Sequence, residues 1–172
     1  MIQAYNFLAS WQLFPEKGVY ESGERPKSGI YKIEAAGGDK KELIVYNNWV
    51  TLENQAFASQ YKIIADGDLN TFTDTELADK VQVSFIDSIS FEIHFYKNGQ
   101  VVLHVVYEIM PNGYLKITQQ GFRTDGSSYT NSEIYHKQMS VLPYSASVSG
   151  AVIRPTEEGV IKHKALTAME EQ

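Results

Sequence analysis

The sequence predicts an all-β protein: an antiparallel up-and-down β-barrel of about eight to ten strands, with a short N-terminal helix and a C-terminal arm. Alternating or β-branched runs recur along the 172 residues, and dipeptides typical of tight hairpin turns separate them. Aromatic residues make up 12% of the chain, and they suit strands and the linings of binding cavities. A meander this long with little helix to cover it has to hide one face, and closure into a barrel does so while it removes exposed sheet edges.

Turn signals divide the chain into its elements. The expected turns, where glycine accepts the positive φ of a tight hairpin, are Gly37-Gly38, Asp66-Gly67, Asn98-Gly99, Asn112-Gly113 and Asp125-Gly126. The strands predicted around them are 29–35, 43–51, 56–65, 81–87, 89–97, 100–110, 114–123 and 129–138. Residues 5–11 are expected to form one or two helical turns, and 163–171 has helix-forming composition. Ser, Gly and Pro between 143 and 155 end the meander, so we expect a barrel domain at 1–140 and a partly helical arm at 141–172.

Composition excludes several classes of function. The chain has no cysteine, which removes disulfides, thiolate zinc sites and cysteine nucleophiles, and fits a reducing compartment. Its net charge of −6 leaves no basic surface for phosphate backbones, so no nucleic-acid partner is expected. The start of the chain lacks the pattern of a secretory signal, and no stretch approaches the ~20 apolar residues of a membrane span. A cytoplasmic protein is expected, unless an export signal has been removed.

Two-residue turns at Asn98-Gly99 and Asn112-Gly113 predict which side chains share a face of the sheet. The first turn pairs Ile93 with His104, and paired residues point to the same side. The second turn continues this face along the next strand. The predicted inner face carries nine apolar residues and four polar ones. The apolar residues are Ile89, Phe91, Ile93, Phe95, Val102, Val106, Met110, Leu115 and Ile117, and the polar ones are His104, Glu108, Gln119 and Arg123. Three interpretations of these polar groups are open. They hydrogen-bond to one another in an internal network, they plug one end of the barrel, or they orient a bound molecule.

The same register predicts an apolar outer row on the strand 100–110. This row would consist of Val101, Leu103, Val105, Tyr107 and Ile109. Such a surface needs cover, either from the C-terminal arm or from a second copy of the protein. A homodimer through the outer face of 101–109 is therefore one expectation.

Two segments resemble bacterial lipocalin-like domains of the calycin superfamily. They are "SWQLFPEKGVYESGERPKSGIYKIE" near the start and "YLKITQQGFRTDGSSYTNSEIYHKQ" at the end of the barrel, and the resemblance covers roughly residues 6–138. It implies a barrel whose base is closed by Trp11, although lipocalins usually begin Gly-x-Trp and this chain has Ala9-Ser10-Trp11. It also implies a cation stacked on that tryptophan, for which Lys137 or Arg123 is the candidate; the alternative is a Lys137 that faces solvent.

No metal site and no cofactor are expected. His94 and His104 face opposite sides of the predicted hairpin, and His136 and His163 lack ligand spacing. Haem occurs in some barrels of the wider superfamily, but a lone inward His104 is more typical of a hydrogen-bonded core residue. The sequence contains no nucleophile elbow, phosphate loop or dinucleotide fingerprint.

These observations predict a barrel that binds a small, mainly hydrophobic ligand with a polar or acidic head, without catalysis. Gln119, His104 and Arg123 would meet the head of the ligand. One alternative is a small barrel enzyme of the isomerase, cyclase or decarboxylase type, which uses His104 with Glu108, about 13 Å apart along a strand, or a cavity tyrosine such as Tyr31. Another is a structural or interaction module whose barrel is filled by its own side chains. A cavity of ~300 Å³ or more would favour ligand binding over this last alternative.

Overall fold

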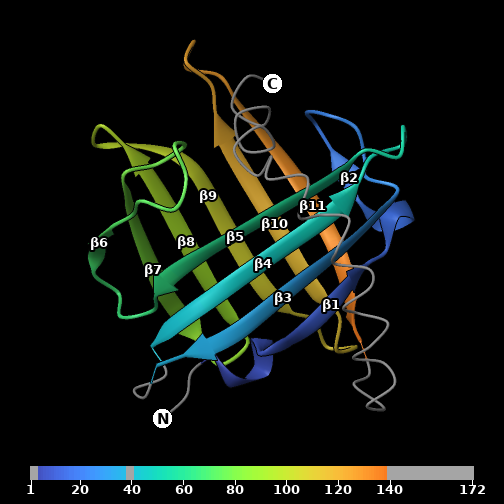
Figure 1. Cartoon of the computed structure of the whole chain (residues 1–172), viewed down its shortest axis with the longest axis horizontal. Helices are drawn as coiled ribbons and strands as arrows, with labels where there is room; N and C mark the ends of the chain where they lie inside the picture. The colour runs from blue at the N-terminus through green and yellow to red at the C-terminus, as the bar shows by residue number, and fades with distance from the viewer. Residues whose placement is uncertain (1–3, 38–40, 139–172) are drawn as a thin grey trace.

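The computed structural model describes residues 4–37 and 41–138, which form one antiparallel sheet bent into a nearly closed barrel (Figure 1). The strand order is β5-β4-β3-β1-β11-β10-β9-β8-β7-β6, and β2 also pairs with β11. The strands are β1 (Ala9–Leu13), β2 (Val19–Tyr20), β3 (Ser28–Ala36), β4 (Glu42–Val50), β5 (Ala56–Ile64), β6 (Leu69–Thr71), β7 (Lys80–Asp87), β8 (Ser90–Lys97), β9 (Gln100–Ile109), β10 (Leu115–Phe122) and β11 (Ser128–Lys137). In Figure 1, β3, β4 and β5 cross in front of β8, β9 and β10, so the two halves of the sheet face each other.

The all-β prediction is confirmed, and each of the eight predicted strands is present. The predicted N-terminal helix at residues 5–11 is only a single 3₁₀ turn, η1 (Tyr5–Phe7), and Trp11 lies in β1. A strand is favoured there because β3 and β11 flank it and supply partners for its backbone. A second 3₁₀ turn, η2 (Pro15–Lys17), leads into β2. The predicted helix at 163–171 and the arm at 141–172 lie outside the described residues.

Trp11 lies on β1 and is buried in the core of the barrel. Its side chain is 1% exposed, and its indole N–H donates a hydrogen bond to the carbonyl oxygen of Phe7 at 3.1 Å. Lys137 is the cross-strand partner of Trp11 and places Nζ 5.7 Å from the centre of an indole ring. Lys137 therefore lies within cation–π distance of Trp11, as the resemblance implies, and its side chain is at the same time exposed to solvent.

A β-bulge in β9 overturns the predicted inner face of this strand. The Asn98-Gly99 turn forms as predicted, with φ of 52° and 79°. Beyond it the register shifts, because Tyr96 pairs with Val101 and Phe95 with Leu103, which leaves Val102 as an extra residue. A shift of one residue turns every later side chain to the other face.

Burial explains why the chain adopts this register. Leu103, Val105 and Tyr107 point into the barrel and are at most 5% exposed. His104 and Glu108 lie on the outer wall instead, where His104 is half-buried and Glu108 is exposed. The predicted register would have placed a carboxylate and an imidazole among aromatic rings, and the burial of such groups without partners is strongly unfavourable.

This correction removes the surface on which the predicted homodimer depended. Leu103, Val105 and Tyr107 belong to the core and not to an outer row. Val101, His104, Val106 and Glu108 occupy the outer face of β9, the first three half-buried and Glu108 exposed, while the extra residue Val102 packs against the core. The apolar patch that was expected to need cover from the arm or a second copy is therefore not formed by β9.

The next turn compensates for the bulge. Residues 111–113 form a three-residue loop in which the amide of Met110 donates to the carbonyl oxygen of Tyr114 at 2.8 Å. Leu115 therefore pairs with Ile109 and not with Met110. Because two shifts cancel, Gln119 faces inward as predicted even though His104 does not.

None of the helical segments in residues 4–37 and 41–138 has the length and apolar character needed to cross a bilayer.

Candidate functional site

The mouth of the barrel holds a cavity of about 440 Å³. Its walls come from the segment between β2 and β3, from the β4–β5 hairpin and from the inner faces of β10 and β11. The lining residues are Leu13, Tyr20, Ser22, Gly23, Glu24, Arg25, Pro26, Gly29, Asn47, Trp49, Thr51, Leu52, Glu53, Phe57, Gln119, Asn131, Glu133 and Tyr135. The cavity exceeds the size at which small-molecule sites begin.

A carboxylate held by two phenols forms one wall of this cavity. The hydroxyl of Tyr20 donates to Glu133 Oε2 at 2.6 Å, and the hydroxyl of Tyr135 donates to Glu133 Oε1 at 2.8 Å. Burial raises the pKa of Glu133, and the two phenol hydrogen bonds oppose this shift. Glu133 is thus fixed in place and presents its remaining lone pairs to the cavity.

The strands explain how this wall is assembled. Glu133 is the cross-strand partner of the buried Ile117, so it faces the interior, and Tyr20 reaches it because β2 pairs with β11. Asn131 secures the segment after β2: its side-chain oxygen accepts the amides of Glu21 and Ser22 at 2.8 and 3.2 Å, and its amide donates to the carbonyl oxygen of Ser22 at 3.0 Å. The cavity wall is therefore tied to the sheet.

Two side-chain amides in the cavity are unpaired. Asn47 on β4 and Gln119 on β10 line the cavity, and neither side chain makes a hydrogen bond within the described part of the chain. Both are half-buried. Buried polar groups normally have partners, so these two amides are available to a bound molecule.

The opposite wall is aromatic. Trp49 and Phe57 are cross-strand partners on β4 and β5, with ring centroids 5.4 Å apart and an interplanar angle of 16°. Gly29 is the partner of Trp49 on β3 and leaves its indole uncovered by a side chain from that strand. A flat apolar surface of this kind suits the body of an organic molecule.

The charges around the mouth are predominantly negative. Glu24, Glu53 and Glu133 contribute three carboxyl groups to the lining, and Arg25 contributes the one guanidinium. Salt and water screen the rim residues, but Glu133 lies deeper and is screened less. The cavity therefore favours a neutral or positively charged guest over an anion.

Side chains fill the barrel below the mouth. The hydroxyl of Tyr31 contacts that of Tyr107 at hydrogen-bond distance and lies 3.3 Å from that of Tyr61. Burial raises the pKa of all three phenols, so they stay neutral. A space of about 30 Å³ remains beside them, which is room for about one water molecule. It shares Asn47, Trp49 and Gln119 with the mouth cavity.

The structure brings only some of the predicted site residues together. Gln119 lines both cavities, and Tyr31 and Phe95 line the small one. Phe91 and Ile93 are fully buried core residues that line neither. His104, Val106 and Glu108 were predicted to face inward; this is wrong, because the bulge places them on the outer wall.

Arg123 was also predicted to lie inside the barrel, and this is wrong too. It lies in the β10–β11 turn, where its guanidinium donates to the Oγ of Ser127 at 3.3 Å and to the carbonyl oxygen of Ser128 at 3.4 Å. Its guanidinium carbon lies 4.9 Å from the centre of the Tyr129 ring. The extended side chain is occupied by this turn and lines neither cavity.

Sequence reasoning missed the residues that form the polar wall: Tyr20, Asn47, Asn131, Glu133 and Tyr135. The facing of β11 depends on a five-residue turn at 123–127, in which the amide of Arg123 donates to the carbonyl oxygen of Ser127 at 2.8 Å. A two-residue Asp125-Gly126 turn would give the opposite facing. The available signal was the alternation Tyr129, Asn131, Glu133, Tyr135, in which two aromatic residues flank an amide and a carboxylate.

No protein-family model matches the chain, and no curated protein matches it in sequence. Among solved structures, the chain is similar to a redesigned β-barrel at 12% identity, over 80% of this chain and 96% of that chain, with a TM-score of 0.43. It is also similar to the siderocalin Ex-FABP, a protein described as having dual ligand specificities, at 12% identity, over 88% of this chain and 87% of that chain, with a TM-score of 0.36.

Proposed function

We propose that this protein binds a small molecule in the mouth of its barrel and does no chemistry on it. The observation that carries the proposal is the 440 Å³ cavity, which combines an aromatic wall with the unpaired amides of Asn47 and Gln119. Ligand sites typically join a mainly apolar lining to a few convergent polar groups. The small size of the inner cavity means that the ligand occupies the mouth and not the barrel axis.

The lining favours a ligand with an apolar body and a hydrogen-bond-donating or cationic head. The body would lie on Trp49 and Phe57, and the head would meet Glu133 and the oxygens of Asn47 and Gln119. An acidic head was predicted because His104 and Arg123 were expected inside the barrel. With both of them elsewhere and Glu133 in the wall, an anion would face a carboxylate.

The contacts of Glu133 support binding over catalysis. Each of its oxygens already accepts a phenol hydrogen bond, which holds the group in one geometry, while burial raises its pKa. The alternative hypothesis of a small barrel enzyme depended on His104 and Glu108. Both residues lie on the outer wall and line neither of the two cavities. The alternative of a barrel filled by its own side chains applies only below the mouth, where tyrosines occupy the interior.

Tryptophan fluorescence tests the proposal, because Trp49 lines the cavity whereas Trp11 is 1% exposed and gives a constant background. Decylamine and decanoate have the same apolar body and opposite head charges. We expect decylamine to shift the emission saturably and to bind at least about tenfold more tightly than decanoate. Trp49→Phe should remove the signal.

Two charge-matched variants make the test specific. Glu133→Gln should weaken decylamine binding, whereas Glu108→Gln, which removes the same charge from the outer wall, should not. Tighter binding of decanoate would reject the proposed head group. If neither compound shifts the emission, and native mass spectrometry of protein from its host shows no co-purifying small molecule, the binding function itself is rejected.

A further inference from the structure

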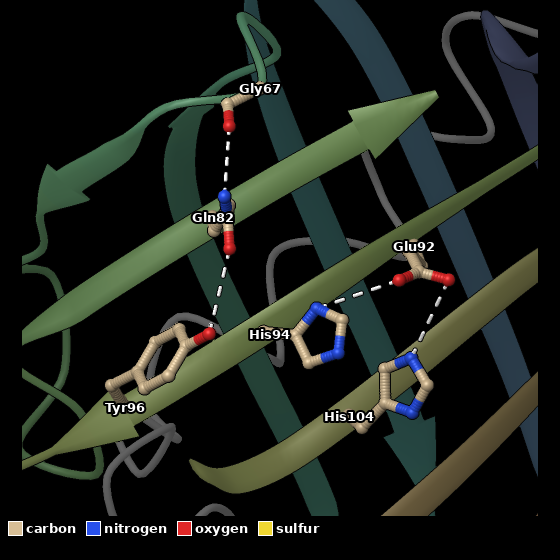
Figure 2. Close-up of polar contacts among 6 residues, drawn as sticks. All are labelled: Gly67, Gln82, Glu92, His94, Tyr96 and His104. Carbon is tan, nitrogen blue, oxygen red and sulfur yellow. Dashed lines mark hydrogen bonds and ion pairs between the residues drawn. The ribbon is translucent and has the colours of Figure 1, made fainter. Parts of the chain in front are cut away.

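The outer wall of the barrel carries a group of metal-ligand side chains that the mouth cavity does not use. Glu92 and His94 are on β8 and His104 is on β9, and all three point away from the barrel interior (Figure 2). The bulge at Val102 creates the group, because it makes His94 and His104 direct cross-strand partners. The sequence prediction that these two histidines face opposite sides is therefore wrong.

The three side chains are close enough to share one ion. Glu92 Oε1 lies 3.7 Å from His94 Nδ1, and Glu92 Oε2 lies 3.8 Å from His104 Nε2. One ligand atom from each residue can be chosen so that all three atoms lie within 4.8 Å of one another. Ligand atoms around a tetrahedral ion are about 3.4 Å apart, since the metal–ligand bonds are about 2.1 Å. Side-chain rotations that move these atoms by about an ångström therefore suffice.

One nitrogen in the group lacks a partner. His104 Nε2 is buried and makes no hydrogen bond to any described residue, and its 3.8 Å separation from Glu92 is too long for one. The two imidazole rings are stacked, with centroids 4.2 Å apart and an interplanar angle of 12°.

Among the described residues, the cross-strand neighbours of the group include no competing cation. Along the same row of the sheet, Gln82 on β7 pairs with His94 and Gln120 on β10 pairs with His104. Gln82 is occupied: its amide donates to the carbonyl oxygen of Gly67 at 2.9 Å, and its oxygen accepts the hydroxyl of Tyr96 at 3.5 Å (Figure 2). Glu92 itself is flanked by Ser84 and Val106. No lysine or arginine is the cross-strand neighbour of a ligand.

We propose that Glu92, His94 and His104 bind one divalent transition-metal ion of the zinc class on the outer wall of the barrel. Two imidazoles and one carboxylate are a donor set that suits Zn²⁺, Co²⁺ or Ni²⁺, whereas Ca²⁺ and Mg²⁺ prefer all-oxygen sites. Three protein ligands leave a coordination position open to water or to another molecule. The ion would tie β8 to β9, and the two rings would turn out of their stack so that their lone pairs converge on it.

Calorimetric titration of the full chain with ZnCl₂ tests this site, using protein prepared without a polyhistidine tag. We expect one Zn²⁺ per chain and a rise in the thermal unfolding temperature when Zn²⁺ is added. His94→Gln and His104→Gln should each weaken binding at least about tenfold and reduce the Zn²⁺-dependent rise. Far-UV circular dichroism of each variant establishes that it is folded before it is titrated.

The other two histidines of the chain serve as matched controls. His136→Gln should leave Zn²⁺ affinity unchanged, since His136 on β11 does not belong to the group, and the proposal expects the same of His163→Gln. Glu92→Gln should weaken binding while it keeps the size of the side chain. The proposal is overturned if the wild-type chain does not bind Zn²⁺, if both His94→Gln and His104→Gln bind it as tightly as wild type, or if only His163→Gln loses it.

Discussion

Glu133 shows how a single residue links the polar wall to the stability of the barrel. Its carboxylate lies among Tyr20, Tyr135 and the inner face of β10, where burial disfavours charge. A leucine at this position would suit the core better, so the residue opposes stability while it supplies the acceptor that the proposed ligand needs. Groups of this kind gather at functional sites because function and stability place different demands on them.

The raised pKa of Glu133 gives a prediction about pH. Between the unfolded value near 4.5 and the raised folded value, the folded protein binds more protons than the unfolded chain, so this residue makes the free energy of unfolding fall as pH rises. Glu133→Gln should remove this dependence. In urea unfolding, the free energy of unfolding of the variant minus that of wild type should be larger at about pH 8 than at about pH 4. An equal difference at both pH values would contradict the assignment, and Glu108→Gln is the exposed control.

At the scale of the element, one extra residue in β9 decides which chemistry faces in and which faces out. The bulge at Val102 buries Leu103, Val105 and Tyr107, and it brings His94 beside His104 on the outer wall. Strand existence and the Asn98-Gly99 turn follow from local sequence, because turn geometry and alternation are local properties. The bulge does not follow from local sequence. It forms because one register buries the aliphatic side chains of the strand and the other would bury its polar ones, and this choice depends on the whole sheet.

The same distinction explains what was predictable in the site. The inward facing of Gln119 was predicted correctly only because the bulge and the three-residue turn at 111–113 shift the register by one residue each. The facing of β11, which carries Glu133 and Tyr135, depends on the five-residue turn at 123–127. Tyr20 is placed by a two-residue strand that no alternation could reveal. The barrel was therefore predictable, and the polar wall of its mouth was not.

Cysteine accessibility checks the register of β9, because the chain has no native cysteine. Val105 is 2% exposed inside the barrel, whereas Val106 is half-buried on the outer wall. Val106→Cys should react with a maleimide reagent at least about tenfold faster than Val105→Cys under native conditions. The two variants should react at similar rates in urea. Faster native labelling of Val105→Cys would restore the register without a bulge.

At the scale of the whole molecule, the barrel has one incomplete seam. The sheet ends at β5 on one side and at β6 on the other, and these two strands do not pair with each other. The segment between β6 and β7 covers the gap: Phe72 and Ala78 are 4% and 3% exposed, and Phe72 packs edge-on against Tyr61 on β5. The seam lies beside the small inner cavity, which Phe72 and Thr75 help to line.

One hydrogen bond ties this cover to the edge of the sheet. The amide of Lys62 on β5 donates to Asp74 Oδ2 at 2.6 Å, so a side chain takes the place of a neighbouring strand. Asp74→Ala removes this acceptor and should speed hydrogen exchange at Lys62 by at least about tenfold, because a protected amide becomes open to water. Asp74→Asn keeps an acceptor oxygen and should retain most of the protection. Amides in the centre of β9, which is paired on both sides, should exchange at wild-type rates in both variants. Uniform acceleration across the barrel would show that Asp74 supports the fold as a whole and would contradict a local role at the seam.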